Sequence, residues 1–198
     1  PHHLNDLDYL RQMYAHGAAE HMDVLGVHTF GFGRTPEIAP DGEICPLDNP
    51  LRPSYVRVEG PTLDRGCWPV EGLCFRRVEQ MRAIMVEAGD GDKPMWATEF
   101  GWPIRPLPCC LTQSDWPAHY WQTVSEGQQA RYLIRAYRYA EAQWPWMEVM
   151  FLWNLDWSRY QDYDEACGYC ESMGAYSILD PDGSPRMAYK WLMGEERD

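Results

Sequence analysis

The chain has 198 residues, of which 45% are hydrophobic and 14% aromatic, enough to bury the core of one domain. Its net charge of −13 excludes nucleic acid and anionic membrane surfaces as favourable partners, because both would repel it. A neutral ligand fits this charge, and ten tryptophans and twelve tyrosines provide flat rings suited to sugar faces. No apolar run reaches the length of about 18 residues that a membrane span needs. No signal peptide is visible, so we expect any secretory leader to lie upstream or to have been removed.

The first part of the chain predicts a helix followed by a strand. Asn5 or Asp6 is a helix cap, and apolar residues then recur on one helical face as far as Ala18. The short apolar run 23–30 is typical of a buried strand. Residues 33–71 are rich in proline, glycine and charge without a period, which predicts a long excursion from the core.

The rest of the chain repeats this order. Residues 75–88 have helical spacing, and the run 94–100 reads as a second strand. A capping-box pattern at Ser125–Gln128 begins another helix. The run 147–157 predicts a third strand, and a last helix follows Pro185. Long loops come after each strand.

Helices and strands therefore alternate along the sequence, which is typical of an α/β fold. The strands are nearly continuous apolar runs, so we expect a parallel sheet buried on both faces. No repeat or linker divides the chain, and residues 1–198 are interpreted as one domain.

Three side chains with functional potential come at the carboxyl ends of the expected strands: His28, Glu99 and Trp153. Strict alternation along a strand would place Glu99 on the same face as Met95 and Ala97. Parallel α/β sheets bind ligands at the carboxyl ends of their strands, and the loops that follow determine specificity. The sequence therefore predicts a site at this edge.

Four segments carry a family resemblance: DVLGVHTFG (23–31), WATEFGW (96–102), FLWNLDW (151–157) and YSILDPDGSPRMAYKWL (176–192). In this order they resemble the carboxyl-terminal half of clan-A retaining glycoside hydrolases, in particular the cellulase-like and xylosidase-like enzymes of families 39 and 5. The resemblance implies a partial (β/α)8 TIM barrel, formed by strands six to eight with their helices and long loops.

The resemblance also implies site residues for hydrolysis of a β-linked polysaccharide or oligosaccharide. Glu99 stands where the family has its nucleophile, and neither a cofactor nor a metal is expected. A substrate-binding role is implied for five residues: His28, Trp102, Trp153, Asn154 and Trp157. Asn154 and the nearby Asp156 have a second interpretation, in which they fix the loop that follows the strand.

Two features depart from the family pattern. Phe30 stands where the family often has a tyrosine near the nucleophile. The acid/base glutamate should follow an asparagine on strand four, and the chain contains no Asn-Glu pair. Glu165 and Glu171, in the last loop, are alternative acids that no geometric reason favours. A complete barrel needs about 250 residues and eight strands, so we expect an incomplete barrel that a second chain or self-association completes.

All seven cysteines occur in or beside the loops: Cys45, Cys67, Cys74, Cys109, Cys110, Cys167 and Cys170. This placement favours disulfide bonds and an extracellular or secreted protein, with at least one cysteine left over. The alternative is a zinc site at Cys167 and Cys170, with Cys109, Cys110 or His119 as further ligands.

Two classes of function remain open from the sequence. The first is a retaining glycoside hydrolase with Glu99 as nucleophile. The second is a carbohydrate-binding or assembly module that derives from such a barrel and has lost catalysis. Glu99 itself has a structural alternative, an ion pair with Arg34 or Arg105, and His28 and Trp153 are alternatively interior residues.

Overall fold

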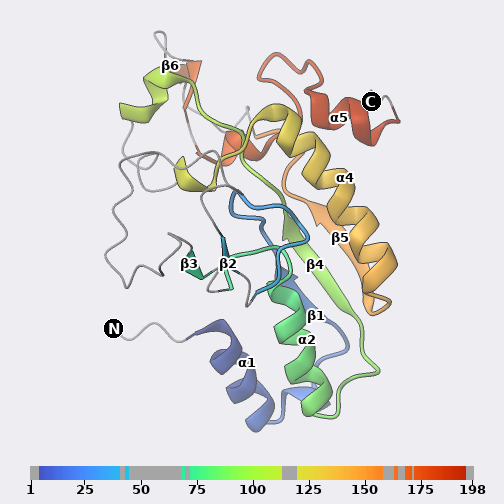
Figure 1. The fold of residues 1–198 in the computed structure, drawn as a ribbon. Helices are drawn as coiled ribbons and strands as arrows, with labels where there is room; N and C mark the ends of the chain where they lie inside the picture. Colours follow the sequence, from blue (N-terminus) through green and yellow to red (C-terminus); the bar gives the residue numbers. More distant parts are fainter. Residues whose placement is uncertain are drawn as a thin grey trace.

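The computed structural model describes residues 5–40, 43–44, 68–69, 72–112, 120–157, 163–164, 168–170 and 172–194. Its centre is a three-stranded parallel sheet in the order β1–β4–β5 (Figure 1). These strands are β1 (Leu25–His28), β4 (Met95–Phe100) and β5 (Met147–Leu152). The α/β class and the parallel pairing are as expected, and the architecture is compatible with part of a TIM barrel.

The α-helices of the described ranges are α1 (Asp6–Ala15), α2 (Arg77–Glu87), α4 (Glu126–Gln143) and α5 (Met187–Leu192). The expected caps are confirmed. The Asn5 side chain accepts a hydrogen bond from the Leu7 N–H, and Ser125 and Gln128 form a reciprocal capping box. Within the described ranges, no helix is long and apolar enough to cross a membrane.

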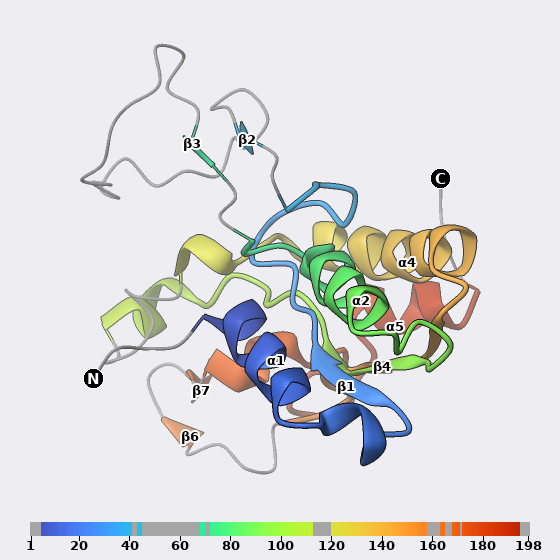
Figure 2. The same cartoon turned by 90° about the horizontal axis from the view of Figure 1, so that it is seen from below.

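The core lies between one face of the sheet and the helices α2 and α4, which lie on the same side of it (Figures 1 and 2). Leu25, Val27 and Met95 supply the sheet side of this core. Met85 of α2 and Leu133 of α4 are fully buried against them. Burial of such large side chains is the main stabilising contribution, at about 1.5–3 kcal/mol each.

The opposite face of the sheet is exposed, and the expectation that both faces would be buried is wrong for this chain. Phe151 on β5 is 51% exposed, although its ring is apolar. Thr98 and Glu148 are exposed as well. The helices cover a single face, whereas parallel sheets ordinarily need cover on both. An uncovered face of this kind is typical of an interaction surface.

In the described parts of the loops after the strands, the elements are short. The first loop includes the antiparallel pair β2 (Glu43–Ile44) and β3 (Trp68–Pro69), and the last includes β6 (Tyr163–Asp164) and β7 (Gly168–Tyr169). The described 3₁₀ helices are η1 (Ala18–Glu20), η2 (Pro108–Thr112), η3 (Tyr120–Gln122) and η5 (Ser172–Tyr176). Of the excursion expected over residues 33–71, residues 41–42, 45–67 and 70–71 lie outside the described ranges.

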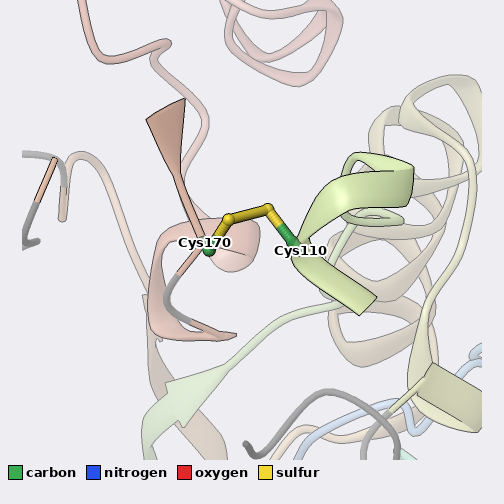
Figure 3. The surroundings of a disulfide bond; sticks show 2 residues. All are labelled: Cys110 and Cys170. Carbon is green, nitrogen blue, oxygen red and sulfur yellow. A yellow bond between two sulfur atoms is a disulfide. The ribbon is translucent and has the colours of Figure 1, made fainter. Parts of the chain in front are cut away.

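A disulfide bond joins the loop after β4 to the loop after β5. It links Cys110 in η2 to Cys170, 60 residues later (Figure 3). Cys109 is disulfide-bonded as well, whereas Cys74 is a buried free thiol. Burial raises the pKa of this thiol. Within the described ranges, Cys74 is thus a leftover cysteine of the kind expected.

The bond contradicts the alternative zinc site. Cys110 and Cys170 are joined to each other, so neither is available as a thiolate ligand. No group of three or more potential metal ligands occurs in the part of the chain that the structure describes. Four residues of the cysteine and zinc interpretations lie outside that part: Cys45, Cys67, His119 and Cys167.

We expect the double substitution Cys110→Ser/Cys170→Ser to lower the free energy of unfolding by about 4 kcal/mol, because the bond closes a loop of 60 residues. Urea denaturation under non-reducing conditions measures this. Cys74→Ser is the control, since it removes a thiol but no cross-link and should cost less. An equal loss in both variants would contradict a stabilising cross-link.

Candidate functional site

The candidate site is a carboxylate and an imidazole at the carboxyl ends of two neighbouring strands. Glu99 of β4 pairs with His28 of β1 in the sheet register. The Nδ1 atom of His28 lies 3.4 Å from Oε2 of Glu99. The two side chains are 57% and 26% exposed, respectively, so solvent reaches both. Among the described residues, the side chain that faces the Glu99 carboxylate is thus the imidazole of His28, in place of Arg34 or Arg105.

Glu99 does not share a face with Met95 and Ala97, and the strict alternation expected from the sequence is wrong here. The register runs from Val27 opposite Ala97 directly to His28 opposite Glu99, which leaves Thr98 as an extra residue. Such a bulge reverses the alternation beyond it. Glu99 therefore lies on the face of His28, away from the helices.

Trp153 follows β5 and forms an aromatic pair with Trp157. Their ring centroids are 5.3 Å apart and the planes are inclined by 47°. Both rings are partly exposed. The Trp153 N–H donates to the carbonyl of Phe100, which holds this segment beside the end of β4. The pair therefore lies close to the end of the strand that carries Glu99.

Asn154 is buried and its amide is used by the loop. Its Nδ2 donates to the carbonyl of Met173, and its Oδ1 accepts from the Ser177 hydroxyl at 2.8 Å. Ser177 in turn accepts from the N–H of Trp157. Of the two interpretations of Asn154, the geometry therefore fits the one in which it fixes the loop.

Trp102 is fully buried and offers no ring face to a sugar, contrary to the role expected for it. Its Nε1 donates to the carbonyl of Arg34 at 2.7 Å, and its ring contacts Phe75 and Tyr132. Gly31 permits this burial, since a Cβ at that position would overlap the indole ring. The buried Trp102 ring therefore packs between the loop after β1 and the loop after β4 and holds them together.

Aromatic residues that the sequence interpretation did not assign to the site continue from His28. Phe30 meets His28 edge-on at 6.1 Å and Tyr176 at 5.3 Å. Burial raises the pKa of the Tyr176 phenol to about 12, so it is neutral at physiological pH. The alternating FGFG of residues 30–33 was a local signal for an aromatic loop, whereas nothing in the sequence connected Tyr176 to it.

The second carboxylate of a retaining hydrolase has no assigned position in the described ranges. Glu165 and Glu171 both lie outside them. Glu148, on the exposed face, accepts a hydrogen bond from Trp96 Nε1 near the start of β5. It therefore lies at the opposite end of the sheet from Glu99.

Solved glycoside hydrolases resemble this structure. A family 39 glycoside hydrolase from the gut symbiont Bacteroides cellulosilyticus WH2 matches with a TM-score of 0.53 at 18% identity, over 90% of this chain and 28% of its own. β-Glucuronidases from Bifidobacterium dentium and Ruminococcus gnavus match with TM-scores of 0.43 and 0.44, at 19% and 16% identity. They cover 88% and 98% of this chain, which spans 20% and 30% of theirs.

No protein-family profile and no curated protein matches the chain. The likeness to the family 39 hydrolase therefore concerns the fold alone. The match covers 28% of the length of that hydrolase. The fold is thus glycoside-hydrolase-like.

We expect Gly31→Ala to lower the free energy of unfolding by about 3 kcal/mol, because the methyl group displaces the Trp102 ring and its hydrogen bond to Arg34. Gly91→Ala is the matched control, since its Cβ would lie 3.4 Å from Val86, an ordinary contact. That variant should stay within about 1 kcal/mol of the parent protein. Equal stabilities in thermal or urea denaturation would contradict the tight approach at Gly31.

Proposed function

We propose that the chain is the carboxyl-terminal portion of the catalytic barrel of a retaining β-glycoside hydrolase, with Glu99 as nucleophile. The observation that carries the proposal is the His28–Glu99 pair at the carboxyl ends of parallel strands. The Trp153–Trp157 rings beside it support a sugar-binding surface. The family 39 likeness supports the fold that such chemistry uses.

The proposed chemistry has two steps. A carboxylate oxygen of Glu99 attacks the anomeric carbon and forms a covalent glycosyl ester while the glycosidic C–O bond breaks. The leaving oxygen takes a proton from a second carboxyl group, about 5–5.5 Å from the nucleophile. That group then removes a proton from water, which attacks the same carbon and releases Glu99.

His28 fits a positioning role in this scheme. An Nδ1–H of the imidazole would face Oε2 of Glu99 at 3.4 Å and so orient the carboxylate. The Thr29 N–H donates to the Glu99 carbonyl at 2.9 Å, so the backbone on both sides of the pair is held. Glu99 is thereby pre-positioned before a substrate binds.

The second carboxylate is proposed to come from a segment that completes the barrel. The exposed face of the sheet carries the apolar ring of Phe151 on the edge strand β5, and further strands would pack there. That segment belongs either to the same polypeptide or to a second chain or copy. Residues 1–198 would then be one portion of a larger catalytic domain.

An extracellular location is part of the proposal. The Cys110–Cys170 bond and the disulfide-bonded Cys109 fit an oxidising compartment, because reduced thiols predominate in the cytosol. Cys109, Cys110 and Cys170 lie in the loops after β4 and β5, and their disulfide bonds would then restrain loops that contact substrate. A carbohydrate substrate fits this location and the acidic charge of the chain.

The second candidate is a carbohydrate-binding or assembly module without catalysis. It is favoured by the surroundings of Glu99, since the side chain facing it in the described part of the chain is an imidazole and not the second carboxylate that a retaining mechanism needs. The aromatic rings would then bind sugar reversibly. The two candidates differ in whether Glu99 forms a covalent bond.

We expect a 2-deoxy-2-fluoro-β-glycoside with a good leaving group to label Glu99 of the complete enzyme, because the second step is slow in such a probe. Glu99→Gln should abolish both labelling and turnover and retain sugar binding. Glu148→Gln is the control, since Glu148 lies at the other end of the sheet. Peptide mass spectrometry reads the label. Turnover by Glu99→Gln would contradict the proposal, and reversible binding without label would favour the module.

We also expect the 198-residue chain alone to self-associate through its exposed sheet face. Phe151→Ser should weaken this association, because Phe151 is 51% exposed on that face. Met193→Ser is the matched control, since Met193 is 66% exposed but follows α5. Sedimentation velocity measures the mass. If the parent chain is monomeric at every concentration, the proposal that its exposed sheet face requires a further segment or copy is contradicted.

A further inference from the structure

A second group of aromatic side chains extends from the site toward the loops after β1 and β4. We call Phe30, Phe32 and Trp121 the aromatic arc. Phe30 meets Phe32 edge-on at 6.5 Å, and Phe32 is parallel to Trp121, with a centroid distance of 6.1 Å and an interplanar angle of 9°. Parallel rings at this separation are offset, so neither covers the other completely. All three rings are partly exposed.

The backbone holds the arc in an unusual conformation. Phe32 has a φ of 50°, in the left-handed region that bulky residues avoid. Gly33 follows with a φ of 71°, and a Cβ there would lie 2.8 Å from the carbonyl oxygen of Trp121. Such strain persists only where the surroundings over-determine it, and it clusters at binding sites. The two loops are therefore fitted to each other around these rings.

A cavity borders two of the three rings of the arc. Phe30 and Phe32 line a cavity of about 270 Å³ that His28 also borders. Asp6 and Arg77 are part of its polar lining and form an ion pair with each other. The hydrogen bond from Arg77 lowers the pKa of Asp6, which therefore remains a carboxylate able to accept hydrogen bonds. Apolar ring faces beside a few charged hydrogen-bonding groups suit a neutral, hydroxyl-rich ligand.

We propose that the arc and this cavity bind additional sugar units, so that the substrate is an extended β-linked glycan and not a glycoside of one unit. This proposal rests on the proposed function. Strand order places β4, with Glu99, between β1 and β5. The arc begins after β1 and the Trp153–Trp157 pair follows β5, so aromatic surfaces lie on both sides of the nucleophile. A glycan bound to both would cross Glu99.

The test is the dependence of affinity on chain length. The probes are β-1,4-linked gluco- and xylo-oligosaccharides of two and six units, measured by titration calorimetry. We expect Trp121→Ala and Phe32→Leu to weaken binding of a six-unit probe by about three- to tenfold, the usual effect of one aromatic contact, and to leave the two-unit probe unchanged. Phe32→Tyr should restore the parent affinity.

Tyr9→Ala is the matched control, because Tyr9 is a 58% exposed aromatic residue on α1 outside the arc. Equal weakening at both lengths, no change in the arc variants, or no binding of any probe by the parent would overturn the proposal. Labelling of Glu99 by the one-unit fluoroglycoside is independent of the arc. If Glu99 is labelled but affinity does not depend on chain length, the proposal that the arc binds sugar is contradicted and the proposed hydrolase function is not. If affinity depends on chain length but Glu99 is not labelled, the proposed hydrolase function is contradicted and sugar binding by the arc is not.

Discussion

The extra residue at Thr98 is the constraint on which the arrangement of the site depends. Met95 and Ala97 are fully buried on the helix side of β4, and so is Phe100. An uninterrupted strand would place Glu99 with the first two and turn Phe100 to solvent. A buried unpaired carboxylate and an exposed aromatic ring would both be unfavourable. The bulge resolves this conflict, and it brings the carboxylate beside His28.

Local signals determined the helices well. The cap at Asn5 and the capping box at Ser125 are chemical features of a few neighbouring residues, so they could be recognised without tertiary information. The apolar runs were sufficient to predict where the strands lie. They were not sufficient to predict which face of the sheet each side chain occupies. The strand itself, residues 95–100, contains no glycine or proline to mark an extra residue, and the bulge arises from pairing with β1.

The roles of the tryptophans could not be separated from sequence for a similar reason. Trp102 and Trp153 both stand just beyond a strand, in similar aromatic surroundings. Gly31, which lies 71 positions before Trp102, decides that the first ring is buried. The pairing of Cys110 with Cys170 was equally undetermined, because seven cysteines allow many combinations. Contacts between distant loops, and not local propensity, decided each of these cases.

The Cys110–Cys170 bond has a consequence for how this rim can change. Loops on parallel α/β sheets usually diverge independently, because each is anchored only by its own strand and helix. Here the loops after β4 and β5 share a covalent anchor. A graft that replaces one of them without its partner leaves an unpaired cysteine, so specificity would be transplanted to a related scaffold only by exchanging both loops as a unit.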